Sequence, residues 1–175
     1  MEVDRILEYR TQSFINFRDF DFDDRGKHRF RWIDIKKFAF ELTEWDDRLI
    51  LQALIANPEF PDDYVGGGVD REGLRHGPYW RASITPEAYR KIDTVSALDI
   101  FGGWLSGCGV IPAELDSAIA REVRDPMRTA DSRYLLRELG SSASNDYGDI
   151  HIEFHEFVLI SEVEKSVLLV VATDD

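Results

Sequence analysis

The stretches "HIEFHEFVLI" at residues 151–160 and "SVLLVVA" at residues 166–172 decide the fold. The first begins with alternating polar and apolar residues, as in a strand with one solvated face, and then becomes apolar on both faces. The second is a continuous apolar run, which is typical of a central strand. Because only the short segment "SEVEK" separates them, the two runs predict an antiparallel C-terminal hairpin.

A second hairpin is predicted near the N-terminus, in "RDFDFDDRGKHRFRW" at residues 18–32. Aspartates alternate with phenylalanines before the glycine, and basic residues alternate with mainly aromatic ones after it. A three-residue turn between the two runs would place Asp21 opposite Arg29 and Asp19 opposite Arg31. A shift of one residue would break these pairs, so charge and hydrophobic pattern select the same register. The pairing also neutralises the basic run, which argues against nucleic-acid binding there.

Four segments in the middle of the chain are predicted to be helical from their apolar residues and their capping signals. They cover residues 44–56, 86 to 100 or 101, 112–123 and 131–139. Together with the two hairpins, they predict an α+β fold. We expect a mixed, mostly antiparallel sheet with N-terminal and C-terminal hairpins and about four helices packed mainly on one face.

Length and composition limit the class of protein. With 175 residues, 43% of them hydrophobic, the chain can bury one substantial core, and we expect residues 1–175 to form a single globular domain. No segment reaches the roughly 18 apolar residues of a membrane helix, and the first residues are charged where a signal peptide is apolar. The single cysteine, Cys108, has no second cysteine for a disulfide or a zinc site. These features predict a cytoplasmic protein.

The charge of the chain predicts its kind of partner. Thirty-four acidic and 21 basic side chains give a formal net charge of −13. Such a surface repels nucleic acid and anionic lipid, and it attracts a basic protein. The alternative is that the acidic excess only confers solubility. We therefore expect a protein partner, basic if electrostatics guide it, with no nucleic acid, no membrane and no cofactor; the oligomeric state stays open.

The longest irregular segment, residues 58–83, is a candidate binding site. Loops of this length in a compact domain are usually functional or mobile. Arg75, His76, Tyr79 and Trp80 would form a contact patch if they were exposed, because tyrosine, tryptophan and arginine carry much of the energy at protein interfaces. The alternative is that Tyr79 and Trp80 open a strand and fold into the core.

The polar start of the C-terminal hairpin suggests a possible metal site. On a strand, His151, Glu153 and His155 would share one face and offer two nitrogens and a carboxylate, ligand types that zinc or iron accept. Alternate residues on one strand are about 6.5 to 7 Å apart, so a metal would need further ligands from a neighbouring strand. We therefore favour a structural strand with a solvated flank over a metal site.

No motif in the sequence fixes a reaction. Cys108 lies in "GGWLSGCGV" without the neighbouring frame of a known nucleophile, and no catalytic residue is assigned. The preferred hypothesis is a non-enzymatic acidic binding protein, similar in general character to an immunity protein or an antitoxin that inhibits a basic partner. The alternative is a metal-dependent, hydrolase-like enzyme that uses His151, Glu153 and His155.

Overall fold

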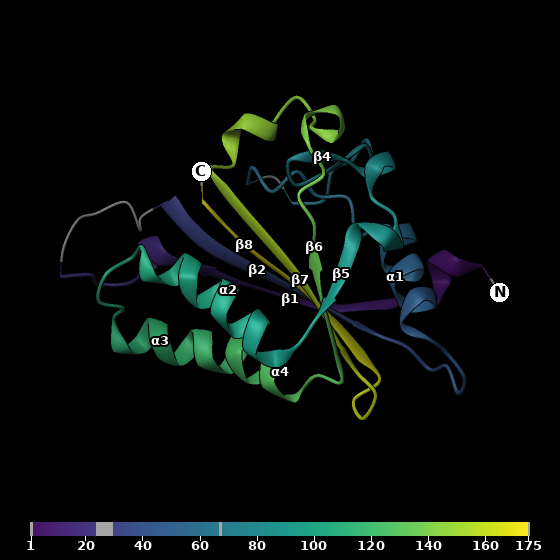
Figure 1. Ribbon diagram of the computed structural model, residues 1–175, viewed down its shortest axis with the longest axis horizontal. Coiled ribbons are helices and arrows are strands. Elements are labelled where there is room, and N and C mark those ends of the chain that lie inside the picture. Colours follow the sequence, from purple (N-terminus) through teal and green to yellow (C-terminus); the bar gives the residue numbers. More distant parts are fainter. Residues whose placement is uncertain (1, 24–29, 67, 175) are drawn as a thin grey trace.

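A six-stranded antiparallel sheet organises the part of the chain that the computed structural model describes, residues 2–23, 30–66 and 68–174. Its strand order is β1-β2-β8-β7-β6-β5, and every neighbouring pair is antiparallel (Figure 1). The strands are β1 (Glu8–Asn16), β2 (Arg31–Ala39), β5 (Tyr89–Ile92), β6 (Ser132–Leu136), β7 (Glu153–Ser161) and β8 (Ser166–Asp174). A separate two-stranded sheet pairs β3 (Arg75–His76) with β4 (Tyr79–Trp80).

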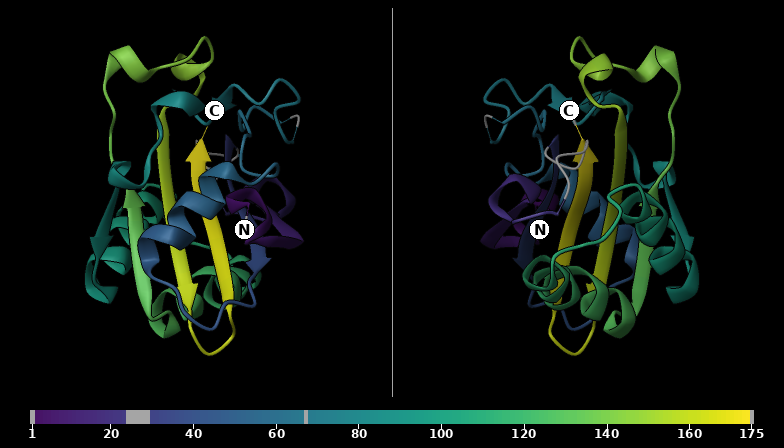
Figure 2. Two further views of the ribbon diagram at one scale, coloured as in Figure 1. Left: turned by 90° about the vertical axis from the view of Figure 1, so that its right-hand side faces the viewer. Right: turned by 90° about the vertical axis from the view of Figure 1, so that its left-hand side faces the viewer.

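The helices lie on both faces of this sheet. They are α1 (Asp47–Ala56), α2 (Thr94–Ser106), α3 (Ala113–Ile119) and α4 (Asp125–Thr129), and the π-helical turn Ala120–Arg124 joins the last two without a break. Short 3₁₀ turns cover Val3–Arg5, Phe17–Asp19, Arg81–Ser83, Pro86–Ala88, Ser141–Ala143 and Gly148–Ile150. Figure 2 shows α1 in front of the sheet in one view and α2 with the α3–α4 segment in front of it in the opposite view.

Each face of the sheet has its own hydrophobic core. Phe38 of β2 and Val158 of β7 pack with the α1 residues Ile50 and Leu54 on one face. On the other face the buried residues of β2, β7 and β8 pack with α2, α3 and α4. The predicted α+β class and mostly antiparallel sheet are confirmed. Because α3 and α4 are continuous, the described residues hold three helical segments, slightly fewer than the four expected.

The C-terminal hairpin is confirmed as the centre of the sheet. β7 and β8 pair from Glu153 opposite Asp174 to Ser161 opposite Ser166. The apolar run of β8 is buried along nearly its whole length, as the sequence predicted. β7 begins at Glu153, so His151 lies before the strand rather than on it.

The N-terminal hairpin forms with a different register from the predicted one. Asn16 of β1 lies opposite Trp32 of β2, and the chain leaves the sheet at the 3₁₀ turn Phe17–Asp19. Phe17 is fully buried, with its ring centroid 5.5 Å from that of Trp104 in α2, and this packing draws the chain out of the sheet before the aspartates. The β1–β2 ladder therefore ends before Asp19 could pair with Arg31, and Arg31 lies opposite Asp174 on the other side, in β8. The predicted partner of Asp21, Arg29, lies outside the described residues.

Two of the four predicted helices are wrong in whole or in part. Residues 131–139 contain strand β6, which pairs with β5 on one side and β7 on the other. Residues 86–92 form a 3₁₀ turn and β5, and α2 begins after Asp93, whose side chain accepts a hydrogen bond from the Ser96 amide at 2.7 Å. The sequence predicts Thr85 as the N-cap of this helix, but its side chain makes no capping hydrogen bond. For the first helix the sequence predicts Thr43 as the N-cap, whereas Asp46 takes this position in the structure.

Along the residues that the structure describes, no helix combines the length and the apolar character that a membrane span requires.

Replacing Phe157 with alanine is expected to lower the free energy of unfolding by about 3–5 kcal/mol, because it empties a fully buried position next to Phe101 in the α2 face. Chemical denaturation monitored by circular dichroism measures this change. Val163→Ala in the exposed turn of the same hairpin is the control, with an expected change within about 0.5 kcal/mol. Equal small effects in the two variants would contradict a core beneath the centre of β7.

Candidate functional site

The segment between α1 and β5 packs over one end of the sheet, on the face that α1 covers (Figure 2). Its short hairpin, β3 and β4, turns at Gly77, where φ is +52°. A Cβ atom at this position would lie 2.4 Å from the ring of Phe154 on β7, so only glycine fits. The close approach at Gly77 fixes the hairpin against the sheet.

Three charged sheet residues lie beneath this segment. Asp34 and Lys36 on β2 and Glu156 on β7 project to the α1 face, and each is no more than 2% exposed. Asp34 and Glu156 are the cross-strand neighbours of Val171 on either side of β8. Since buried charges are stable only with partners, the covering segment must supply them.

Glu156 is satisfied by a closed network. Nε2 of His76 lies 2.5 Å from one carboxyl oxygen of Glu156, and Tyr89 donates its hydroxyl to the other. Nδ1 of His76 donates to the carbonyl oxygen of Phe60 at 2.7 Å, because a carbonyl only accepts. Burial, together with the charge of Glu156, raises the pKa of Tyr89 well above its usual value. The network ties the 57–80 segment to β7 and β5, and its buried residues are inaccessible to a substrate.

Lys36 is also satisfied by the covering segment. Its Nζ lies 2.8 Å from Oδ2 of Asp62 and donates to the carbonyl oxygen of Glu59 at 3.0 Å. The other oxygen of Asp62 accepts a hydrogen bond from the Tyr64 amide at 2.9 Å. The Lys36 ammonium lies 5.3 Å from the centroid of the Tyr64 ring. The charges of Lys36 and Asp62 therefore balance each other within the core.

Asp34 is satisfied only in part. Its Oδ1 accepts a hydrogen bond from Nε2 of Gln12 at 2.5 Å, whereas its Oδ2 is buried without a hydrogen-bond partner among the described residues. The hydroxyl of Tyr64 is likewise buried and unpaired within the described part of the chain. Burial raises the pKa of Asp34 to about 6, and it raises the pKa of Tyr64 well above its usual value. An unsatisfied buried polar group costs about 1–3 kcal/mol, so each of these groups would gain from a ligand.

Asp34 and Tyr64, the two residues that carry these unpaired atoms, belong to the lining of one cavity of about 380 Å³ between β1, β2 and the covering segment, which we call the β1–β2 cavity. Its described lining is Gln12, Phe14, Trp32, Asp34, Asp62, Tyr64, Gly66 and Gly68. The rings of Phe14, Trp32 and Tyr64 form a continuous aromatic wall, with successive centroids 5.4 and 6.0 Å apart. Phe14 is 56% exposed, so this wall reaches the surface. The cavity combines hydrogen-bond acceptors with aromatic faces.

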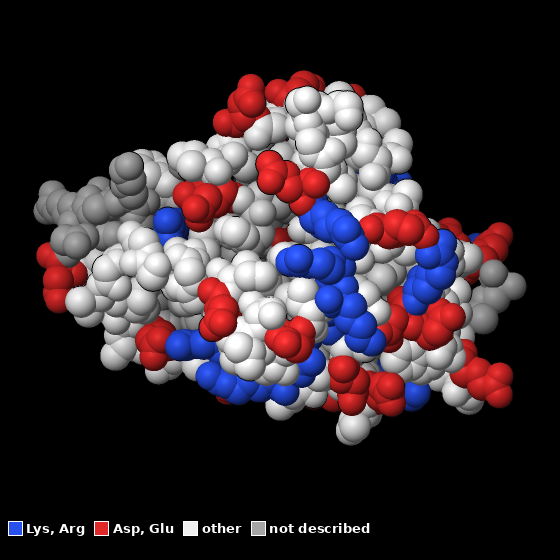
Figure 3. Space-filling model, in the orientation of Figure 1, with Lys and Arg blue, Asp and Glu red and all other residues white. Residues whose placement is uncertain are grey.

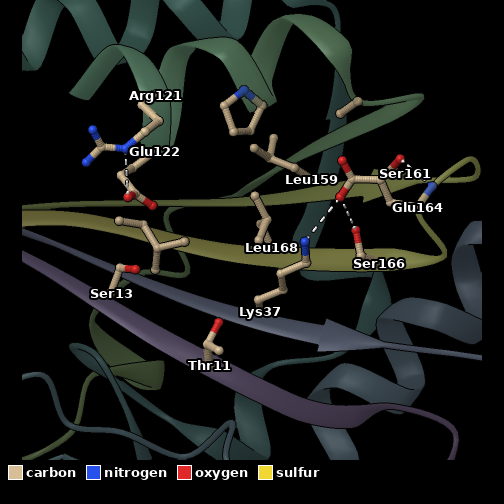
Figure 4. A pocket seen from close by; sticks show the side chains of 13 residues that line it. Thr11, Ser13, Lys37, Arg121, Glu122, Leu159, Ser161, Glu164, Ser166 and Leu168 are labelled. Carbon is tan, nitrogen blue, oxygen red and sulfur yellow. Dashed lines mark hydrogen bonds and ion pairs between the residues drawn. The ribbon is translucent and has the colours of Figure 1, made fainter. Parts of the chain in front are cut away.

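A second hollow, of about 240 Å³, lies on the opposite face of the sheet beside the π-helical turn (Figure 4). Its charged groups satisfy each other: Lys37 pairs with Glu164 at 3.2 Å, and Arg121 pairs with Glu122 at 3.3 Å. None of the unpaired buried polar atoms found in the described residues belongs to its lining. The β1–β2 cavity is therefore the stronger candidate for a site.

The residues of the predicted contact patch, 75, 76, 79 and 80, make most of their contacts with other parts of the protein. His76 is fully buried, which corrects the expectation that it is exposed. Arg75 makes two hydrogen bonds to Asp146, at 2.7 and 2.9 Å, and its guanidinium lies 5.6 Å from the Trp80 ring centroid. The hydroxyl of Tyr79 accepts a hydrogen bond from the backbone amide of residue 139. Tyr79 and Trp80 form a short strand, as the alternative interpretation predicted, but both are half-buried rather than part of the core, and Tyr79 packs against the core of the α1 face.

The three residues of the proposed metal site are not brought together. The ring nitrogens of His151 lie 3.1 Å from Oγ1 of Thr173 and 2.9 Å from the carbonyl oxygen of Asp63. His155 and Glu153 are neighbours, with 3.8 Å between Nε2 and a carboxyl oxygen, and burial lowers the pKa of His155. Among the described residues, no group of three or more histidine, cysteine, aspartate or glutamate side chains is placed to hold a metal ion.

Sequence reasoning missed Gln12, Asp34 and Tyr64. One signal was present in "WIDIKKFAF", residues 32–40. Asp34 and Lys36 alternate with the residues between them and so share a strand face with the core residue Phe38. Charged residues on the buried side of a strand predict a polar network or a site. The partners supplied by residues 57–80 had no comparable local signal.

Comparisons with known proteins do not assign a family. No family model matches the chain, and no curated protein matches it. Among solved structures, the crystal structure of citrus MAF1 is similar at 13% sequence identity, with 86% of this chain and 91% of that chain covered and a TM-score of 0.36. A similarity at this score carries no functional conclusion.

Asp34→Asn is expected to stabilise the protein at neutral pH. The raised pKa of about 6 means that the folded state holds its proton more tightly than the unfolded state. The contribution of Asp34 to the free energy of unfolding is therefore greatest below about pH 4. It falls by about 3 kcal/mol as the pH rises through about 6. The variant lacks this loss, so its advantage in unfolding free energy should grow between about pH 4.5 and about pH 7.5.

Asp47→Asn is the matched control for Asp34. Burial acts to raise the pKa of Asp47, but hydrogen bonds from Tyr134, Ser132 and Lys91 outweigh it and lower the pKa. Its variant should therefore lose stability relative to the parent over the same pH rise. A pH-independent difference for Asp34→Asn would show that this carboxyl group titrates normally.

His76→Ala is expected to destabilise the protein by more than about 3 kcal/mol, because it leaves Glu156 buried with one partner fewer. Leu74→Ala, at a half-exposed position two residues away, should change the stability by less than about 1 kcal/mol. Both values come from denaturant unfolding. An unfolding curve of His76→Ala that matches the parent would restore His76 as an exposed contact residue.

Proposed function

We propose that this protein is a non-enzymatic binding protein whose partner is a basic protein, and that a cationic side chain of that partner enters the β1–β2 cavity. One observation carries the proposal: a buried carboxyl oxygen of Asp34 and the hydroxyl of Tyr64 both lack a partner among the described residues, and both residues belong to the lining of an aromatic cavity. A cation with N–H donors supplies the charge and the hydrogen bonds that these two groups lack.

The charges around the cavity support a cation with a single charge. With a pKa of about 6, Asp34 is mainly ionised at neutral pH. Asp62, the other carboxylate in the described lining, is already paired with Lys36. One negative charge is therefore uncompensated, and a cationic side chain would neutralise it.

The aromatic wall supports the same class of ligand. A cation placed against the face of an aromatic ring gains about 0.5–2 kcal/mol, and tryptophan is the most favourable ring. Trp32 lies between Phe14 and Tyr64 in the wall. Acceptors and ring faces bind a cation, and neither is a nucleophile–base pair of the kind that hydrolases use.

The net charge of the chain supports a basic partner, and one cationic strip lies away from the β1–β2 cavity. β1 and β2 lie at the opposite edge from β5, where Arg90 and Lys91 are exposed together with the nearby Arg137. Figure 3 shows lysine and arginine side chains gathered where β5 and β6 lie, with acidic groups around them. A basic protein that approaches the β1–β2 edge avoids this cationic strip and benefits from the net charge of −13.

In biological terms, we propose an inhibitor of a basic protein, as an immunity protein or an antitoxin is, acting in the cytoplasm. The acidic excess and the cavity support this class, since electrostatic attraction accelerates the association of an inhibitor with its target. The hydrolase-like alternative would require the His151 ring to leave both of its present partners, Thr173 and the Asp63 carbonyl.

The proposal is tested by titrating the protein with a capped peptide that contains one arginine and one lysine, Ac-Gly-Arg-Gly-Lys-Gly-NH₂, at low salt. We expect shifts of the Trp32 indole and Gln12 amide signals in nitrogen–proton NMR spectra. The neutral peptide with citrulline and acetyl-lysine should produce none. Asp34→Asn should weaken binding by at least about tenfold, because a hydrogen bond to a charged group contributes about 1.5–3 kcal/mol.

Asp23→Asn, at an exposed acidic position outside the cavity, is the control and should retain the parent affinity. Equal binding by the charged and neutral peptides, or by Asp34→Asn and the parent, would reject the cavity as a cation site. A basic protein from the host that binds the parent but not Asp34→Asn would then identify the physiological partner.

A further inference from the structure

The acceptors of the β1–β2 cavity are few and come from separate elements. Asp34 on β2 offers Oδ2, because its Oδ1 already accepts from Gln12. Tyr64 offers its unpaired hydroxyl from the covering segment. Gln12 on β1 donates one of its two amide hydrogens to Asp34, and its side-chain carbonyl oxygen is a further acceptor. A ligand here meets acceptors along one side and aromatic rings along another.

The aromatic wall presents ring faces rather than a closed cage. The Phe14 and Trp32 rings are inclined at 46° with centroids 5.4 Å apart, and the Trp32 and Tyr64 rings are inclined at 32° with centroids 6.0 Å apart. Rings this close to one another leave no room for a cation between them. A ligand must instead lie against the face of one ring, which favours a planar group.

Lysine and arginine differ in how they meet such a surface. The lysine ammonium is a compact, strongly hydrated charge that loses most when it leaves water without a full set of acceptors. The guanidinium of arginine is planar and weakly hydrated, stacks on aromatic rings and presents its donors along its edge. An aromatic ring face and the single free carboxyl oxygen therefore match arginine better than lysine.

We infer that the β1–β2 cavity binds the guanidinium group of an arginine of the partner, stacked against Trp32 with one edge donating to Asp34 Oδ2 and Tyr64 Oη. This inference rests on the proposed function and adds the ligand group and the residues that select it. Trp32 is the residue that distinguishes arginine from lysine, and Asp34 provides the charge that both require.

The test compares three capped tripeptides, Ac-Gly-Arg-Gly-NH₂, Ac-Gly-Lys-Gly-NH₂ and the citrulline analogue, by NMR titration of the full-length protein at low salt. We expect the arginine peptide to bind at least about tenfold more tightly than the lysine peptide, with no saturable binding of citrulline. Trp32→Leu should weaken arginine binding and bring the ratio of the two dissociation constants close to one. Tyr64→Phe should weaken binding of both peptides, because it removes only the hydroxyl.

Trp80→Leu is the matched control, because Trp80 is a half-buried tryptophan outside the cavity lining. It should leave the preference for arginine unchanged. Circular dichroism and thermal unfolding establish that each variant is folded, and the ratio of the arginine and lysine dissociation constants in the parent provides the test if Trp32→Leu does not fold.

The possible outcomes separate the two proposals. Equal or tighter binding of lysine, or an unchanged ratio in Trp32→Leu, would overturn the arginine inference while the cation site stands. Binding of neither charged peptide would overturn both. Arginine binding that is lost in Trp32→Leu and in Asp34→Asn but kept in Trp80→Leu would establish the inference.

Discussion

Two buried carboxyl groups on the same face of the sheet, Asp34 on β2 and Glu156 on β7, govern the structure around them. They lie on either side of Val171 in β8, at the end of the sheet that α1 does not reach with its apolar residues. An apolar helix over this end would leave both groups unsatisfied, at a cost of several kcal/mol for each ionised group. The long segment between α1 and β5 packs there instead and brings His76 and Asp62 to the sheet.

The two carboxyl groups differ in how many of their oxygens have a hydrogen-bond partner. We relate the fully paired group to stability and the partly paired group to the proposed binding. Glu156 has a partner at each oxygen and lies in a closed network, so it contributes to holding the covering segment in place. Asp34 has a partner at one oxygen only, among the described residues, and its pKa of about 6 shows that its charge is held at the expense of stability. Strained or unsatisfied groups that reduce stability are typical of binding sites, where a ligand completes them.

The sequence predicts those parts of the fold that depend on near neighbours. The hairpin of β7 and β8 follows from two apolar runs separated by a short turn, and the structure confirms it. Strand β6 was mistaken for a helix because a short apolar run such as "YLL", residues 134–136, fits either period, and its pairing with β5 and β7 decided the outcome. The register of the N-terminal hairpin failed because charge pairing in water is weak compared with the burial of Phe17.

The candidate site could be predicted only in part, because it also depends on contacts between residues that are far apart in the sequence. The sequence of β2 places Asp34 on the buried face of the strand, so this part of the site could be predicted. The burial of His76 could not, because it depends on Glu156, 80 residues away along the chain. His76 follows a glycine-rich loop, where exposure is the ordinary expectation.

In the proposed function, the net charge of the protein and the β1–β2 cavity would act on a partner at different distances. The net charge of −13 attracts any basic protein, but salt screens this attraction beyond about 8 Å, and it does not distinguish one partner from another. Discrimination must arise after contact, where solvent is displaced and the local dielectric constant falls. Asp34 is suited to that second stage, because its free oxygen is buried and its charge is poorly screened. A neutral side chain in the cavity would leave this charge uncompensated, so the proposed site would reject wrong ligands as well as bind the right one.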